Sequence, residues 1–140
     1  MDRLPRVAIG GVIVNDGMVL LAKRRDEPDK GKWAIPGGKL KLNETLSEGL
    51  IREIKEETKL NVTVGRLLGI TESISKHFHY IIFDYLCTVI SGQPEASSDA
   101  TDLKYFKMDE LDNSVNESTR EFISKMADGN KTIFISKINL

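Results

Sequence analysis

The chain has a single cysteine, Cys87, among its 140 residues, and this excludes a disulfide within the chain. Because disulfides are rare in reducing compartments, one thiol in an apolar stretch indicates a core residue of a cytoplasmic protein. Internal repeats, low-complexity segments and linker-like stretches are also absent from the sequence. A chain of this length without them is expected to form one domain over residues 1–140.

No apolar run approaches the roughly 20 residues that a transmembrane helix needs, and Met1–Arg6 lead into a short strand-like segment rather than the apolar core of a signal peptide. Neither sign of charge dominates, since 20 basic and 21 acidic residues give a net charge of −1. Such a balance gives no hint of a nucleic-acid polymer as partner. We therefore expect a soluble, cytoplasmic protein that binds neither a membrane nor a nucleic-acid polymer.

The chain does have a dense group of acids behind a double glycine, Gly37-Gly38. Thr45-Leu46-Ser47-Glu48 has the form of a capping box, which predicts a helix from there to about Thr58. Acids spaced i, i+3 and i+4 share one stripe of a helix, and an apolar stripe lies beside them. The acids are Glu53, Glu56 and Glu57, and the apolar residues are Leu46, Leu50, Ile51 and Ile54.

Like charges at i and i+4, such as Glu53 and Glu57, destabilise an isolated helix by roughly 0.2–0.5 kcal/mol. Burial of the pair would raise the cost and push the pKa of at least one carboxyl upward. Bound Mg²⁺ removes this repulsion, because it is a hard cation held by carboxylates, waters and substrate phosphates. Taken alone, three glutamates on a helix are more often a solvated face with salt bridges, so the wider pattern has to decide.

That wider pattern is Gly38, Glu44, Arg52-Glu53-Ile54, Glu56-Glu57 and Leu60. It resembles the Nudix box, the signature of hydrolases that act on nucleoside diphosphates linked to another moiety. Eight of the nine defined positions match over these 23 residues. The departure is Lys59, where the family usually has a glycine that ends the helix in a left-handed conformation. We expect Asn61 to take over the capping role.

Apolar and β-branched runs predict strands over Val7–Val14, Met18–Lys23, Val62–Thr71, Phe78–Ile90, Leu103–Lys107 and Thr132–Ile138. A second helix is predicted over Glu117–Ala127, ended by Asp128-Gly129-Asn130, and a short helical turn over Met108–Asp112. This order favours an α/β fold in which helices cover a mixed sheet. The resemblance, which extends over about residues 5–112, implies a three-layer α/β/α sandwich with a mixed β-sheet. Within the family the chain is most similar to the ADP-ribose pyrophosphatase-type branch.

The resemblance also implies a metal and catalytic site. The implied ligands of Mg²⁺, with Mn²⁺ as a substitute, are the carbonyl of Gly37 and the carboxylates of Glu53, Glu56 and Glu57. Arg52 is expected to orient these carboxylates by charge-assisted hydrogen bonds. Glu44 is expected to contact either metal-bound water or Arg52. Glu53 or a downstream acid, Asp99 before Asp102, is the expected general base.

Substrate contacts are expected from residues outside the box, namely Arg24, Arg25, Lys39, Trp33, His79 and Tyr80. Each also has a simpler interpretation. The arginines and the lysine suit a solvated surface, and Trp33 suits packing beneath the Pro36-Gly37-Gly38 loop. His77 and His79 alternate, which places them on one face of a predicted strand, opposite Phe78 and Tyr80.

Three functions follow from the resemblance. The favoured one is Mg²⁺-dependent hydrolysis of ADP-ribose to AMP and ribose 5-phosphate. A MutT-type enzyme that releases pyrophosphate from nucleoside triphosphates is the alternative, since Glu72–His77 lacks the proline often found there in the ADP-ribose class. A silent domain that senses a nucleotide is a third. Thr132–Ile135 suits an edge strand for a homodimer.

Overall fold

The computed structural model describes residues 4–127, 129 and 131–140. The predicted helix break over Asp128-Gly129-Asn130 and the first residues of the predicted N-terminal segment therefore lie partly outside the described residues. The strands are β1 (Arg6–Asn15), β2 (Met18–Arg24), β3 (Trp33–Ala34), β4 (Gly37–Lys39), β5 (Asn61–Ser75), β6 (His79–Ser91), β7 (Ala100–Lys107) and β8 (Ile133–Asn139). The helices are α1 (Leu46–Thr58) and α2 (Glu117–Met126). Neither described helix is long and apolar enough to cross a bilayer.

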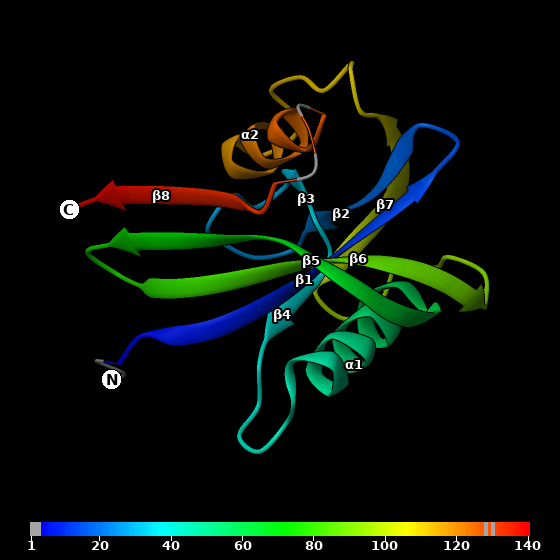
Figure 1. Ribbon diagram of the computed structural model, residues 1–140, viewed down its shortest axis with the longest axis horizontal. Helices are drawn as coiled ribbons and strands as arrows, with labels where there is room; N and C mark the ends of the chain where they lie inside the picture. The colour runs from blue at the N-terminus through cyan, green and yellow to red at the C-terminus, as the bar shows by residue number, and fades with distance from the viewer. Residues whose placement is uncertain (1–3, 128, 130) are drawn as a thin grey trace.

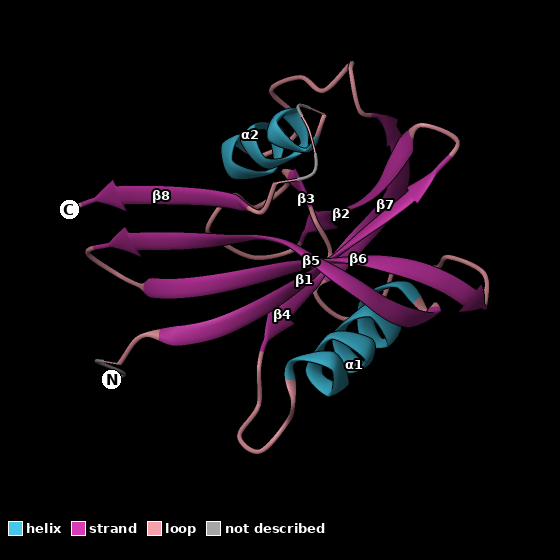
Figure 2. Cartoon of the chain, in the orientation of Figure 1, coloured by secondary structure: helices cyan, strands magenta, loops and turns pink. Residues whose placement is uncertain are grey.

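The strands form one mixed sheet in the order β3-β2-β1-β6-β5-β8, with β4 paired to β1 and β7 paired to β2 (Figure 2). The pairs β1–β6 and β5–β8 are parallel, and the others are antiparallel. Strand β1 changes its neighbour along one edge, because Ala8–Gly10 pair with β4 whereas Val14 and Asn15 pair with β2. The segment between β3 and β4 therefore crosses from one half of the sheet to the other.

The two helices lie on opposite sides of the strands, which confirms the predicted three-layer arrangement (Figure 1). Alternate residues of the central strands supply two separate apolar cores. Val12, Phe122 and Ile123 belong to the core beneath α2, and Ile9, Leu50 and Ile54 belong to the core beneath α1. The side of the sheet that packs on α1 is the α1 face, and the side that packs on α2 is the α2 face.

Helix α1 begins as its sequence predicts. The Thr45 hydroxyl accepts from the Glu48 amide while the Glu48 carboxylate accepts from the Thr45 amide. Leu50 and Ile54 are fully buried, but the prediction is wrong for Ile51, which is 41% exposed because no element packs on that side. The helix ends at Lys59, which adopts the left-handed conformation with φ 65°. Asn61 does not cap the helix; it lies in β5 and donates to Ser91.

Two other predictions need correction. Met108–Asp112 is a turn rather than helical, with one backbone bond from Glu110 to the Lys107 carbonyl. His77 lies in the β5–β6 turn, so it does not share a strand face with His79. Strand β8 forms an edge of the sheet, and its Phe134 and Ile138 are exposed. The homodimer predicted there stays a prediction.

Candidate active site

The double glycine lies against α1 because β4 pairs with β1. Gly37 and Gly38 oppose Gly10 and Ile9, and this register brings the loop over the acid stripe of the helix. A Cβ built on Gly38 would overlap the Glu53 carboxylate, and one built on Gly37 would overlap the Ile9 carbonyl. Gly37 is therefore required for the two backbones to approach this closely, whereas a side chain at position 38 would displace the Glu53 carboxylate.

Glu57 is the most buried acid of this region, with an exposure of 7%. Its Oε1 accepts a hydrogen bond of 3.0 Å from the Gly37 amide. Burial raises the pKa of its carboxyl to about 8, and the nearby charges of Glu53 and Asp99 act in the same direction. Burial also raises the pKa of Glu53. Burial therefore disfavours the ionised form of both carboxyls.

Arg52 is held by three acids of the box. Its Nε donates to Glu44 at 2.6 Å, and its Nη1 donates to Glu53 at 2.8 Å and to Glu56 at 2.9 Å. Its Nη2 reaches the Lys39 carbonyl at 3.1 Å. The guanidinium lowers the pKa of Glu44 to about 2. Arg52 therefore links the loop after β4 to the helix and fixes the Glu53 side chain.

Asp99 comes to the same region from the segment before β7. Its charge is close enough to raise the pKa of both Glu53 and Glu57. Its Oδ1 accepts from Arg25 at 2.7 Å. The charge of Arg24 acts to lower the pKa of Glu57, and its Nε donates to the Pro28 carbonyl. Asp99 and Arg24 therefore lie close enough to Glu57 to affect the pKa of its carboxyl, and Arg25 is bonded to Asp99.

The donor set suits a hard divalent cation. Glu57 is buried and Glu53 is half-buried, and both carboxylates lie against the backbone of Gly37-Gly38, where a carboxylate-bound ion relieves their repulsion. Glu56 is turned toward Arg52 instead. Within the described residues no three acid, histidine or cysteine side chains are already arranged as a ligand set. Glu53, Glu57 and the Gly37 backbone would hold the ion, with Glu56 available once it leaves Arg52.

Other predicted contact residues lie apart from this cluster. Trp33 packs edge-on against Phe106, with ring centres 5.1 Å apart, as the packing interpretation expects. Tyr80 stacks near Phe78 at 5.5 Å, and His79 opens β6 opposite Ile74. In the part of the chain that the structure describes, none of Trp33, His79 and Tyr80 forms a hydrogen bond or ion pair with the acids.

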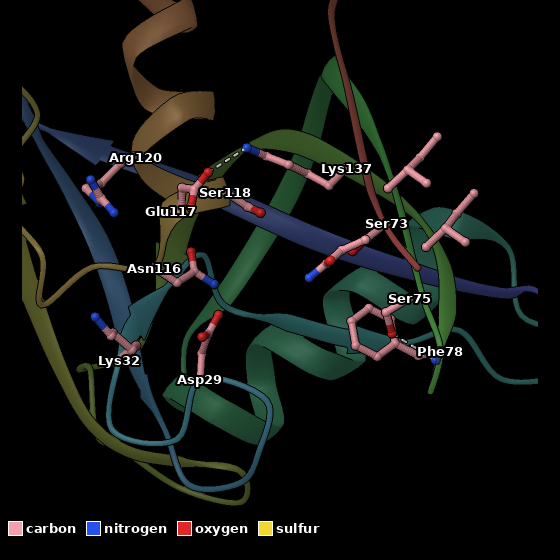
Figure 3. Close-up of a pocket in the computed structure, with 13 residues that line it drawn as sticks. Asp29, Lys32, Ser73, Ser75, Phe78, Asn116, Glu117, Ser118, Arg120 and Lys137 are labelled. Atoms are coloured by element: carbon pink, nitrogen blue, oxygen red, sulfur yellow. Dashed lines mark hydrogen bonds and ion pairs between the residues drawn. The ribbon is translucent and has the colours of Figure 1, made fainter.

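A cavity of about 470 Å³ opens on the α2 face, away from the acids of α1 (Figure 3). Sequence reasoning missed most of its lining, which includes Asp29, Lys32, Ser73, Asn116 and Lys137. In Figure 3 the side chains of Asp29 and Asn116 point toward one another, and Lys137 is paired with Glu117. The one local signal was at Asn116, an N-cap residue whose Oδ1 accepts from the Thr119 amide. The other residues meet only through the fold.

A model of the NUDIX domain matches residues 4–126. The chain belongs to this family. Among Nudix relatives it is similar to an ADP-ribose pyrophosphatase of Methanocaldococcus jannaschii, with 39% identity over 109 residues, covering 76% of this chain and 64% of that protein. It is also similar to a MutT-like protein of Streptomyces ambofaciens, with 35% identity over 108 residues, covering 77% of this chain and 68% of that protein.

Solved Nudix structures share the fold. The crystal structure of a MutT NUDIX hydrolase from Burkholderia pseudomallei matches with a TM-score of 0.78 and 32% identity, covering 87% of this chain and 98% of the other. A MutT protein from Methanosarcina mazei Go1 matches with a TM-score of 0.83 at 22% identity and supports the fold alone. The matched region spans less than two thirds of the Methanocaldococcus relative's length.

Proposed function

We propose that this Nudix domain is a pyrophosphohydrolase dependent on a divalent metal ion, with a nucleoside diphosphate derivative as its substrate. ADP-ribose is the favoured substrate, and addition of one water yields AMP and ribose 5-phosphate. The observation that carries the proposal is a pair of acids against Gly37-Gly38, in which Glu57 is buried and accepts from the Gly37 amide while Glu53 is half-buried and accepts from Arg52. Mg²⁺ is the expected ion, with Mn²⁺ as a substitute, because carboxylate and carbonyl oxygens suit both.

A bound divalent ion supplies charge neutralisation of the diphosphate and a more acidic water. The chain's own residues position these groups. The Gly37 amide fixes Glu57, while Arg52 fixes Glu53 and keeps Glu44 ionised. Asp99 is our candidate for the base that removes the proton from the attacking water. Its hydrogen bond from Arg25 holds its carboxylate in one orientation near the acids.

The substrate assignment is supported by the relatives. The Methanocaldococcus protein is named an ADP-ribose pyrophosphatase, and a Bacillus subtilis relative that is 26% identical is named a putative one. A second candidate is hydrolysis of nucleoside triphosphates to monophosphates and pyrophosphate. It is favoured by the MutT-like relative and by an Escherichia coli CTP pyrophosphohydrolase that is 38% identical over 62 residues.

A hydrolysis panel with product identification tests the proposal. The purified protein is incubated with Mg²⁺ and ADP-ribose, other nucleoside diphosphate sugars, or each common NTP and dNTP, and products are separated by chromatography. We expect AMP and ribose 5-phosphate from ADP-ribose, with activity abolished by EDTA. Turnover of triphosphates alone would replace the favoured substrate by the second candidate. Absence of turnover across the panel would contradict the proposed activity.

A further inference from the structure

Asp84, in the middle of strand β6, is a buried acid that the proposed chemistry does not use. It is 5% exposed. No hydrogen bond or ion pair to its carboxylate exists among residues 4–127, 129 and 131–140. Burial alone raises the pKa of this carboxyl to about 7. Buried polar groups in folded proteins nearly always have a partner, so this carboxylate is suited to accept a hydrogen bond from a ligand.

The strands on both sides of Asp84 have glycine opposite it. Gly10 of β1 and Gly69 of β5 are its register partners, and Gly10 in turn opposes Gly37 of β4. A Cβ built on Gly10 would overlap the Asp84 Oδ1. The carboxylate therefore occupies the space that a side chain on β1 would fill. At about 4.8 Å per strand, Asp84 lies two strands, or roughly 10 Å, from the loop that faces the acids of α1.

Asp84 also marks a boundary on the α2 face of the sheet. On one side of it, Val12 and Leu86 pack into the core beneath α2. On the other side, Ala8 and Ile82 point to the same face and are only half-buried. Ile35, which would contact a Cβ on Gly10, is half-buried as well. The carboxylate thus stands at the inner end of an apolar, partly open strip of the sheet.

This strip continues toward the cavity of Figure 3. Thr71 and Ser73 of β5 oppose Ile82 and Tyr80 of β6, and Ser73 lines the cavity. Alternate residues on these strands therefore connect Asp84 to the cavity along one face. The strip combines apolar contacts with a few hydrogen-bonding groups, of which Asp84 is the charged one at its inner end, an arrangement typical of small-molecule sites.

We infer that Asp84 is a specificity-determining residue that hydrogen-bonds an N–H or O–H group of the substrate's nucleoside half, with its diphosphate on the far side of Gly10 at the acids of α1. This inference rests on the proposed function. A buried acceptor discriminates against a ligand that lacks the matching donor, because the acceptor then stays unpaired in the complex. The ribose hydroxyls and the amino groups of the bases are the two sources of such a donor.

Steady-state kinetics of Asp84→Ala and Asp84→Asn test the inference, using the best wild-type substrate of the panel above. For Asp84→Ala we expect KM to rise roughly tenfold or more, the effect of losing one hydrogen bond to a buried group. We expect kcat and the Mg²⁺ dependence to change by less than about threefold. Asp84→Asn, which keeps a hydrogen-bonding side chain, should recover part of the loss. Asp16→Asn, in the exposed β1–β2 turn, removes the same charge and should match the wild type.

Two further measurements separate recognition from a structural role. Melting temperatures of both Asp84 variants should equal or exceed that of the wild type, since an unpaired buried carboxylate costs stability. Substrates without the 2′-hydroxyl or without the base amino group should show which donor is bound, because the Asp84→Ala effect disappears on the analogue that lacks it. An unchanged KM, or a loss of activity that follows a lowered melting temperature, would overturn the inference alone. A wild type inactive on every nucleotide would overturn the proposed function.

Discussion

Among the described residues, one carboxylate is buried on each face of the sheet, Glu57 on the α1 face and Asp84 on the α2 face, and their surroundings differ. Glu57, on the α1 face, accepts from the Gly37 amide and has a second acid, Glu53, beside it. Asp84, on the α2 face, has apolar residues and glycines around it and no other charge that shifts its pKa. Two acids beside open backbone suit a cation. A single acid in an apolar strip suits one hydrogen bond to a neutral group.

The difference teaches how one sheet serves two halves of a substrate. On the α1 face, the charges of three acids are offset locally by Arg52, which bonds the carboxylates of Glu44, Glu53 and Glu56 and the Lys39 carbonyl at once. On the α2 face, Asp84 is buried with no charged partner among the described residues.

The largest effect is expected for Glu57→Gln. This change keeps the shape of the side chain but removes the charge that attracts the metal ion, so kcat should fall by more than about a hundredfold. Changes to groups that only support metal ligands cost roughly 10–100-fold, which sets the threshold. Circular dichroism should show an intact fold. Glu110→Gln, in the turn after β7, is the control and should keep full activity; near-normal turnover of Glu57→Gln would show that Glu57 is no ligand.

Arg52→Ala should have the next largest effect. It removes the bonds that hold Glu44, Glu53 and Glu56 together, and we expect kcat/KM to fall about 10–100-fold. Arg52→Lys should recover little of the lost kcat/KM, because an ammonium group cannot replace a planar guanidinium group that bonds several acids. The apparent affinity for Mg²⁺, measured from activity against metal concentration, should weaken in both variants. An unchanged metal affinity would mean that Arg52 does not position the ligands.

The two buried acids also predict a pH dependence of stability in metal-free protein. Burial raises the pKa of Glu57 from 4.5 to about 8 and that of Asp84 from 3.8 to about 7. The folded state therefore holds more protons than the unfolded state across this interval, and stability should fall as pH rises from about 4 to 8. The stabilisation is fully present only below the lower, unfolded values.

Urea unfolding in EDTA at several pH values measures this dependence. Glu57→Gln should remove the part of the decline in unfolding free energy that extends to pH 8. Asp84→Asn should remove the part that ends near pH 7. Saturating Mg²⁺ should suppress only the Glu57 part, since a bound cation favours the ionised carboxylate. An equal effect of Mg²⁺ on both parts would show that the two faces are not independent.

The α1 face could be predicted from the sequence because its residues follow one another at fixed spacing. The capping box and the stripe of Glu53 and Glu57 depend only on helical geometry. The setting of Asp84 could not be predicted in this way. It depends on the register that places Gly10 and Gly69 beside it, and these residues lie far apart in the chain. The expectation that Ile51 is buried with the rest of its apolar stripe is wrong for the same reason, since burial depends on which element packs against the helix.

The smallest effect is expected for Lys59→Gly, at the one position where the box departs from its family. Lys59 holds φ 65° and donates its amide to the Lys55 carbonyl, so the backbone already has the shape that glycine would adopt. A residue with a Cβ pays roughly 1 kcal/mol in this conformation. We therefore expect Lys59→Gly to raise the free energy of unfolding by about 0.5–1 kcal/mol in urea titrations, with kcat and KM unchanged. Because Lys59 bonds only to the last turn of α1, a change in kcat would mean that this end of the helix also sets the position of Glu57, two residues away.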